Sequence, residues 1–549
     1  CLIIYYVFNY KIYYYCLDHM SSTRTKKAKT RKFWKVVKTI FLGNSMFQIF
    51  FRVYLLTIIL GAVLLYIGPS HPGQWTISDT GASEHKYTFW DALFVSCSAF
   101  SNTGLTTVCV GNFYNFFGQF VIFALIGLGG IGIISLFFIF WNLFKKADEV
   151  KLNQAILLQN ERGTNKVSSS FRSIIFFVFF IIIVEVIFGL LMSFWLCFYK
   201  TYPIDPNSGT LVFIDPNAQP IECYHDYATA LWYGMFTSVS AMNNAGFDVF
   251  KSSTSLAMFR NDWQVVFQAM TMILIIVGGI GYPIIFDLYE KQRYKKLGLK
   301  YRFSLFTKVA SLSYLLVFIA GLAVAFGFEF GAQSPSTLMG STNYNGEWGD
   351  SEMFNKTWAI VYNTVVTRSA GFSTVNQNLF TIGTQVNFSI LMFIGASPSS
   401  TGGGIRCTTM AIMVLAVCQM IRKRQNVSVF HKKIPQETVR NAFIVFAVGL
   451  GLVILTSAVI LYLPKYGGGR ISDIEGMTFI KVLYEVSSAI GTVGLTMGIT
   501  AQVHWVGLLF LILLMFIGQL SISGTLLSWF KRLPAAKDIQ YSEEDLRIG

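Results

Sequence analysis

Ser101-Asn102-Thr103-Gly104-Leu105 is the first of four short stretches in which a small or polar residue stands two positions before a glycine and Leu or Phe follows it. The other stretches are Asn243-Asn244-Ala245-Gly246-Phe247, Arg368-Ser369-Ala370-Gly371-Phe372 and Gly491-Thr492-Val493-Gly494-Leu495. Each lies between two strongly apolar segments. A glycine-centred loop that occurs four times between apolar segments indicates four related structural units.

The composition is that of a polytopic membrane protein. The chain has 549 residues, of which 53% are hydrophobic and only 13% are charged. Apolar runs such as residues 174–198 exceed the length that crosses a bilayer. The net charge of +15 would raise the question of nucleic acid in a soluble chain. Here the charges stand at the ends of apolar segments, so we predict a lipid environment and no nucleic-acid partner.

Apolar segments of two lengths alternate along the chain. Those long enough to span a bilayer cover residues 47–67, 116–144, 174–198, 265–286, 309–328, 382–421, 442–463 and 506–530. Shorter amphipathic stretches lie between the members of each pair, at residues 90–100, 228–242, 357–367 and 477–489. Because none of the short stretches can cross, we expect each to enter the membrane and return.

This order predicts an all-α polytopic membrane protein with four pseudo-repeats of helix, re-entrant pore helix, filter loop and helix around a central pore. Aligned on the loop glycine, Ser98-Ala99, Ser240-Ala241 and Ser488-Ala489 share one offset, where the third copy has Val365-Val366. The predicted domains are an N-terminal extension with a basic segment, four pore repeats and a cytoplasmic tail. Their bounds are 1–40, 41–145, 168–290, 303–424 with a broken second helix, 438–531 and 532–549.

Lysine and arginine predict the orientation. The basic connections are residues 24–38, 145–172, 291–308, 422–440 and 531–537, which places them and both termini in the cytoplasm of a protein that crosses the plasma membrane several times. Residues 1–19 begin without methionine, so Met20 is a candidate start, and a cleaved signal peptide is the alternative.

The loops suit a dehydrated cation. Backbone carbonyls can replace the water of such an ion, and glycine permits the backbone angles that turn these carbonyls inward. Irregular backbone at membrane depth is tolerated only where it is buried in protein or lines a water-filled cavity, so four such loops indicate a central pathway. The C-terminal ends of the short helices carry partial negative charge, which favours a cation. We therefore predict that the ion is bound by the backbone of Asn102, Thr103, Gly104, Leu105, Asn244, Ala245, Gly246, Phe247, Ser369, Ala370, Gly371, Phe372, Thr492, Val493, Gly494 and Leu495.

At these residues the chain resembles the Trk/Ktr/HKT superfamily of potassium transporters, and its length and helix plan resemble the Ktr-type membrane subunit. The resemblance runs from about residue 41 to the C-terminus. Its most specific pieces are residues 367–372, 491–495, 278–283 and 397–406. It implies potassium uptake without enzymatic chemistry, and it places the four loop glycines in a selectivity filter. Glycine in all four loops favours potassium, because a serine in the first loop of some plant relatives is associated with sodium transport.

The resemblance also implies an intramembrane gate beneath the filter, in the hydroxyl- and glycine-rich break of the sixth segment. The residues concerned are Ser397, Ser399, Ser400, Thr401, Gly402, Gly403, Gly404 and Arg406. One departure is the last spanning helix, where relatives carry an arginine facing this loop and the chain has Gln519. We expect a weaker electrostatic barrier below the filter. Arg406 either compensates for it or is a snorkelling anchor.

The same resemblance implies a homodimer on a cytoplasmic ring of nucleotide-binding regulatory subunits, which would dock on the basic inner loops. Within this chain we predict no cofactor other than K⁺ as the transported ion. The six histidines show no ligand spacing, so no transition-metal site is predicted.

Three other functions stay open at this level. The first is a sodium or unselective cation pathway, because the residues two positions before the loop glycines differ from one another. The second is a membrane-embedded nucleotide or redox enzyme built on Gly127-Leu128-Gly129-Gly130-Ile131-Gly132, although helix packing explains these glycines better. The third is a scaffold that conducts nothing.

Three charged residues lie within or beside the apolar segments, and the two glutamates among them have two interpretations each. Glu185 and Glu485 serve either ion coupling or, as we favour, the support of neighbouring loops. Arg368 precedes the third filter stretch and is expected to brace it, because a cation in the ion path would oppose conduction.

Overall fold

The computed structural model describes residues 46–67, 76–77, 85–132, 167–199, 223–250, 255–259, 264–332, 334–340, 352–424, 426–466, 468–520 and 522. The chain divides into two compact units, residues 1–57 and 58–549. Of the first unit, only the start of the apolar helix α3 (Met46–Tyr66) is described. The predicted segments 1–40 and 532–549, and with them the predicted position of both termini, lie outside the described residues.

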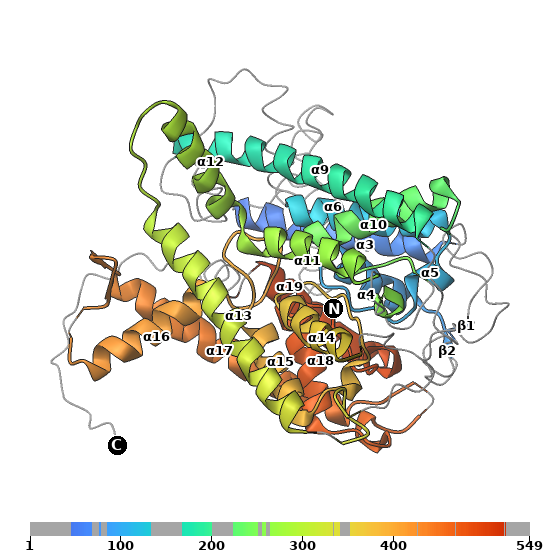
Figure 1. Cartoon of the computed structure of the whole chain (residues 1–549). Helices are drawn as coiled ribbons and strands as arrows, with labels where there is room; N and C mark the ends of the chain where they lie inside the picture. Colours follow the sequence, from blue (N-terminus) through green and yellow to red (C-terminus); the bar gives the residue numbers. More distant parts are fainter. Residues whose placement is uncertain are drawn as a thin grey trace, which may run out of the picture. The chain divides into compact units, whose positions relative to one another are not determined.

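The described part of the second unit is almost entirely helical (Figure 1), which confirms the predicted all-α class. Its helices are α4 (Phe89–Phe100), α5 (Val110–Phe113), α6 (Phe116–Ile131), α9 (Val167–Phe198), α10 (Tyr227–Met242), α11 (Val265–Ile280), α12 (Tyr282–Lys296), α13 (Leu305–Gly331), α14 (Glu352–Val366), α15 (Ile382–Phe393), α16 (Cys407–Ile421), α17 (Gln436–Tyr462), α18 (Phe479–Gly491) and α19 (Trp505–Leu520). Two antiparallel pairs of short strands join β1 (Thr76–Ile77) to β2 (His85–Lys86) and β3 (Ser428–Val429) to β4 (Lys432–Lys433).

Several helices have the length and the apolar composition of membrane-spanning segments. Within the described residues, residues 175–198 of α9, all of α13 and all of α17 are long and apolar enough to cross. The bent pair α11 and α12 would count as a fourth span, and α6, α15, α16 and α19 are apolar but shorter. Large aliphatic side chains on these helices are exposed, among them Leu191, Leu316 and Leu455. Such a surface suits lipid, so the chain is a multi-pass membrane protein.

The predicted span 265–286 is broken near its C-terminal end, which the sequence analysis did not foresee. Helix α11 ends at Ile280, and α12 leaves it at an angle of 90°. The bend lies at Gly281, whose φ of 90° and ψ of 142° are closed to residues with a β-carbon. Pro283 stands in the first turn of the next helix, where its missing N–H costs nothing. Hydropathy alone missed the bend, because apolar residues continue on both sides of it.

The short helices pack in a closed cycle. Each short helix packs on the long-segment helix that begins after the loop of the preceding short helix: α10 on α6, α14 on α11, α18 on α15, and α4 on α19. Helix α4 begins at a cap in which the Thr88 N–H and hydroxyl both donate to the Asp91 carboxylate, at 2.9 and 2.7 Å. The cycle brings the C-terminal ends of α4, α10, α14 and α18 to one place.

Candidate functional site

The four glycine stretches share positive φ angles at two positions. The residue two positions before each glycine has a positive φ, 52° at Asn102, 56° at Asn244, 71° at Ser369 and 46° at Thr492. The glycines themselves have φ values of 91°, 71°, 77° and 94°, in the order Gly104, Gly246, Gly371 and Gly494. The position with the larger φ in each loop requires glycine, and asparagine tolerates the left-handed angles two residues earlier.

Three of the loops leave their helix by the same hydrogen bonds. The Thr103 N–H donates to Ser98 O at 2.8 Å, and the Asn102 N–H donates to Ala99 O at 3.2 Å. This is the Schellman arrangement, which satisfies the last carbonyls of a helix through a left-handed residue. The same pair of bonds recurs at Ala245 and Asn244 and at Val493 and Thr492.

The third loop differs in structure where it differs in sequence. The Ala370 N–H donates to Val366 O at 3.1 Å, one residue later than the acceptor at this position in the other loops. The sequence here is Val365-Val366 in place of Ser-Ala. The third loop therefore follows a slightly different path from its helix to its glycine.

The loop glycines lie next to one another in cyclic order. A β-carbon built on Gly104 would lie 2.5 Å from the Ala245 carbonyl oxygen, and one built on Gly246 would lie 2.7 Å from the Ala370 oxygen. One built on Gly371 would lie 2.6 Å from the Val493 oxygen, and one built on Gly494 would collide with the Thr103 oxygen. Each glycine thus faces the carbonyl that precedes the next glycine. All the predicted filter residues are buried except Gly104, which is half-buried.

The predicted gate residues lie against two of these loops. They belong to the irregular connection 394–406 between α15 and α16, which a parallel bridge between Ile394 and Ile405 closes at its base. Gly402 faces the Ser369 side chain, since a β-carbon there would lie 2.6 Å from Ser369 Cβ. The Gly403 N–H donates to Thr492 Oγ1 at 2.7 Å. The connection therefore touches the residues with positive φ in the third and fourth loops.

The bend at Gly281 holds the same connection from another side. The Ser397 N–H donates to Gly279 O at 3.2 Å, and the Tyr282 N–H donates to Ser399 O at 3.4 Å. A β-carbon on Gly281 would lie 2.9 Å from the Pro398 oxygen. Breaking α11 frees these backbone groups, and the connection between α15 and α16 takes them up.

Arg368 contacts the start of this connection. Its guanidinium donates to Ile394 O at 2.9 Å and lies 4.8 Å from the centre of the Tyr314 ring, and the side chain is only 1% exposed. A buried cation over an aromatic face is attracted by the ring's quadrupole. These contacts agree with the expected bracing role.

The two buried glutamates hold loops. Glu185 accepts a hydrogen bond from Asn243 Nδ2 at 2.7 Å, beside the second glycine stretch. Glu485 accepts from Thr496 Oγ1 at 2.7 Å and from the backbone of Met497 and Thr500, both at 3.1 Å. These bonds fix the segment that follows the fourth glycine, as the supporting reading requires.

Arg406 is the last residue of the same connection, and Gln519 lies near it. Arg406 stands at the N-terminus of α16, and its Nη1 donates to the Gly402 carbonyl. Gln519 follows Gly518, whose carbonyl carbon lies 3.1 Å from the position of a β-carbon on Gly403. Among the described atoms, Gln519 Oε1 has no hydrogen-bond partner.

Three tryptophans, whose role the sequence analysis did not predict, connect short helices to the long-segment helices next to them. Trp232 Nε1 donates to Gln119 Oε1 at 2.8 Å, and Trp358 Nε1 donates to Gln268 Oε1 at 2.9 Å. Trp90 stacks on Trp505 with ring centres 5.2 Å apart. The signal was present in the sequence: counted back from the loop glycine, Trp90 and Trp232 share one offset and Trp358 is one residue off.

The glycine-rich run in α6 serves packing. A β-carbon on Gly129 would collide with the Phe100 carbonyl, and one on Gly130 would collide with the Asn243 side chain. Around Gly127, no described atom lies within 4 Å of such a carbon. The run therefore lets α6 approach the first two glycine loops, which is the packing explanation preferred above.

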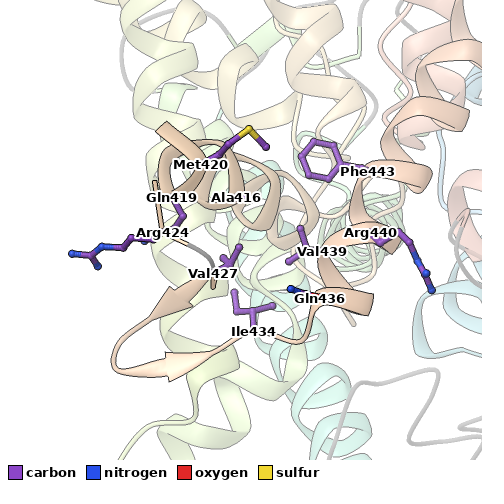
Figure 2. Close-up of a pocket in the computed structure, with 10 residues that line it drawn as sticks. All are labelled: Ala416, Gln419, Met420, Arg424, Val427, Ile434, Gln436, Val439, Arg440 and Phe443. Atoms are coloured by element: carbon purple, nitrogen blue, oxygen red, sulfur yellow. The ribbon is translucent and has the colours of Figure 1, made fainter. Parts of the chain in front are cut away.

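A cavity of about 360 Å³ lies elsewhere, between the end of α16, the β3–β4 hairpin and the start of α17. Its lining is mostly apolar, and it includes none of the predicted filter or gate residues. Figure 2 shows Arg424 and Arg440 extending from opposite margins of the cavity, away from its centre. Both belong to the basic connection 422–440.

Comparison with known proteins identifies the family. A protein of Mycoplasma pneumoniae named as an uncharacterized cation transporter is 33% identical over 96% of this chain and 100% of its own length. The Ktr system potassium uptake protein D of Bacillus subtilis is 29% identical over 94% of this chain and 99% of its own. The crystal structure of the potassium transporter TrkH from Vibrio parahaemolyticus shares the fold, with a TM-score of 0.56 at 15% identity over 87% of this chain and 83% of that chain. The family described as Cation transport protein (TrkH) matches residues 71–541, so the chain belongs to this family of transporters.

Proposed function

We propose that this transporter takes up potassium ions across the plasma membrane through a pore between the four glycine loops, in which backbone carbonyls replace the water of the ion. The observation that carries the proposal is the cyclic contact of Gly104, Gly246, Gly371 and Gly494, each facing the carbonyl before the next. Carbonyl rings of this kind bind dehydrated cations. The four repeats then stand around one pore.

The helix ends support the sign of the ion. Helices α4, α10, α14 and α18 each end within five residues of a loop glycine. Their C-terminal ends carry partial negative charge, which stabilises a cation between them. Potassium is chosen over sodium because all four loops have glycine and because the B. subtilis relative is named as a potassium uptake protein.

The gate in this proposal is the connection from Ser397 to Gly404, which would close the pathway beneath the filter by lying against the third and fourth loops. Arg406 and Gln519 lie near it. Opening requires these residues to move away from Ser369 and Thr492. Potassium then passes without any covalent step.

The partners belong to the same proposal. The transporter works as a homodimer with both termini in the cytoplasm, and a nucleotide-binding regulatory subunit docks on the basic connections. The connection 422–440, with Arg424 and Arg440 beside an apolar cavity, offers such a surface.

The test is ion flux in liposomes that contain the purified protein, with potassium, sodium and proton gradients imposed separately. We expect rubidium uptake that excess sodium does not inhibit. Equal uptake of sodium would favour the unselective pathway.

Gly371→Ser is the companion variant: it should abolish flux, because the φ of 77° and the Val493 carbonyl leave no room for a side chain. Unchanged flux in this variant would leave only a scaffold role.

A further inference from the structure

Thr492 stands in a backbone conformation that its own side chain disfavours. Its φ of 46° and ψ of 53° are left-handed, which costs free energy for any residue with a β-carbon and most for a β-branched one. The matching residues in the other loops are Asn102, Asn244 and Ser369. Asparagine visits this region readily, so only the fourth loop carries a β-branched residue there. Such a conformation persists where surrounding contacts hold it.

The Schellman bonds at the end of α18 hold the backbone of Thr492, and a further contact, on its side chain, comes from the gate loop, which we define as residues 394–406. Thr492 Oγ1 accepts the Gly403 N–H at 2.7 Å, and the Thr492 side chain is fully buried. A β-carbon on Gly403 would lie 2.7 Å from Thr492 Cγ2. Both branches of the threonine therefore contact Gly403, its hydroxyl through a hydrogen bond and its methyl group by packing. Without the hydroxyl, the buried Gly403 N–H would lose this partner.

A second hydroxyl lies beside the first. Ser369 Oγ donates to Gly491 O at 2.9 Å, and Gly402 faces the Ser369 side chain. The bond joins the third loop to the end of α18, directly before Thr492. The gate loop thus meets a surface in which the third and fourth filter loops are already tied together.

We propose that Thr492 is a latch between filter and gate: its hydroxyl holds Gly403 against the underside of the fourth filter loop, and the gate loop leaves the pathway only when this hydrogen bond breaks. The proposal rests on the proposed function, since it assigns a control point within that pore. It adds a direct link between the segment that selects the ion and the segment that closes the pathway.

The principal test is Thr492→Val in the full-length protein, measured as rubidium flux in liposomes. Valine keeps the β-branched shape and removes only the hydroxyl. One hydrogen bond of this kind shifts a two-state equilibrium by roughly five-fold, so we expect about five-fold higher flux with an unchanged preference for potassium over sodium. Thr492→Ser, which restores the hydroxyl, should bring the flux back toward the wild-type value. Thr237→Val is the matched control, because the buried Thr237 hydroxyl of α10 has no partner among the described residues.

Gly403→Ala reaches the same contact from the gate side and leaves the filter sequence intact. Its β-carbon would overlap Thr492, so it should also raise flux if the latch exists. Flux that is unchanged or lower in both Thr492→Val and Gly403→Ala overturns the latch, and so does altered ion selectivity in Thr492→Val. If the wild-type protein carries no potassium and Gly371→Ser changes nothing, the proposed function itself has failed. If Gly371→Ser blocks conduction but neither Thr492→Val nor Gly403→Ala raises it, the latch is wrong and the proposed function stands.

Discussion

At the scale of single residues, two requirements coincide at the loop glycines. Gly246 has a φ of 71°, and a β-carbon there would lie 2.6 Å from Gly371 Cα. The first requirement concerns backbone angles, and the second concerns the space that the next loop occupies. Gly127, in contrast, has a helical backbone and open surroundings within the described structure. The backbone and packing therefore require glycine at position 246, whereas position 127 can accept a side chain.

Gly246→Ala should reduce rubidium uptake by roughly ten-fold or more, since the left-handed backbone alone costs about 1–2 kcal/mol and the methyl group would displace the third loop. Gly127→Ala should leave uptake unchanged and stabilise α6 by about 1 kcal/mol at most. The measurement is uptake by a potassium-starved host, normalised to the amount of protein in the membrane. Equal uptake by the two variants would contradict the assignment of Gly246 to the filter.

At the scale of elements, the sequence predicted the helices better than their ends. Long apolar runs located α9, α13 and α17, because spanning segments need continuous hydrophobicity whatever their neighbours are. The bend between α11 and α12 was missed, since it depends on the backbone angles of Gly281 and on hydrogen bonds with Ser397 and Ser399 far along the chain. Hydropathy carries no information about either.

Gly281→Ala should lower the thermal unfolding midpoint of the purified protein in detergent. A side chain at this φ costs about 1–3 kcal/mol, and its β-carbon would press on the Pro398 carbonyl. Gly327→Ala in α13 is the control, because no described atom lies within 4 Å of the added carbon. A midpoint that falls equally in both variants would show that the bend imposes no special requirement.

At the scale of the whole second unit, the described helices are joined through contacts that cannot be predicted from any single segment of the sequence. The glycine stretches could be found and aligned from the sequence, because glycine followed by Leu or Phe recurs at similar spacing. Their cyclic contact could not be measured there, since it depends on how four distant segments pack. The same holds for the contact of Thr492 with Gly403, and for the contacts of the tryptophans in the N-terminal halves of the short helices.

Trp232→Phe and Trp358→Phe should each lower stability by about 1 kcal/mol, because each leaves a buried glutamine oxygen without its donor. The two effects should add within about 0.5 kcal/mol, since the pairs share no partner. Trp90→Phe is the matched control: it keeps an aromatic ring against Trp505, where the contact is stacking. Apparent unfolding midpoints check all three variants. Losses as large in Trp90→Phe as in the other two would indicate that ring size matters and the hydrogen bonds do not.

The contact of α19 with α4 has a consequence for biosynthesis. Trp505 meets Trp90, and Gly494 meets the carbonyl of Thr103, so the last described helix of the chain completes a cycle that the first short helix begins. During translation, three of the four glycine loops can assemble while the fourth is still in the ribosome. A nascent chain accordingly holds an open arc of glycine loops, and the cycle closes only after the fourth loop and α19 have left the ribosome.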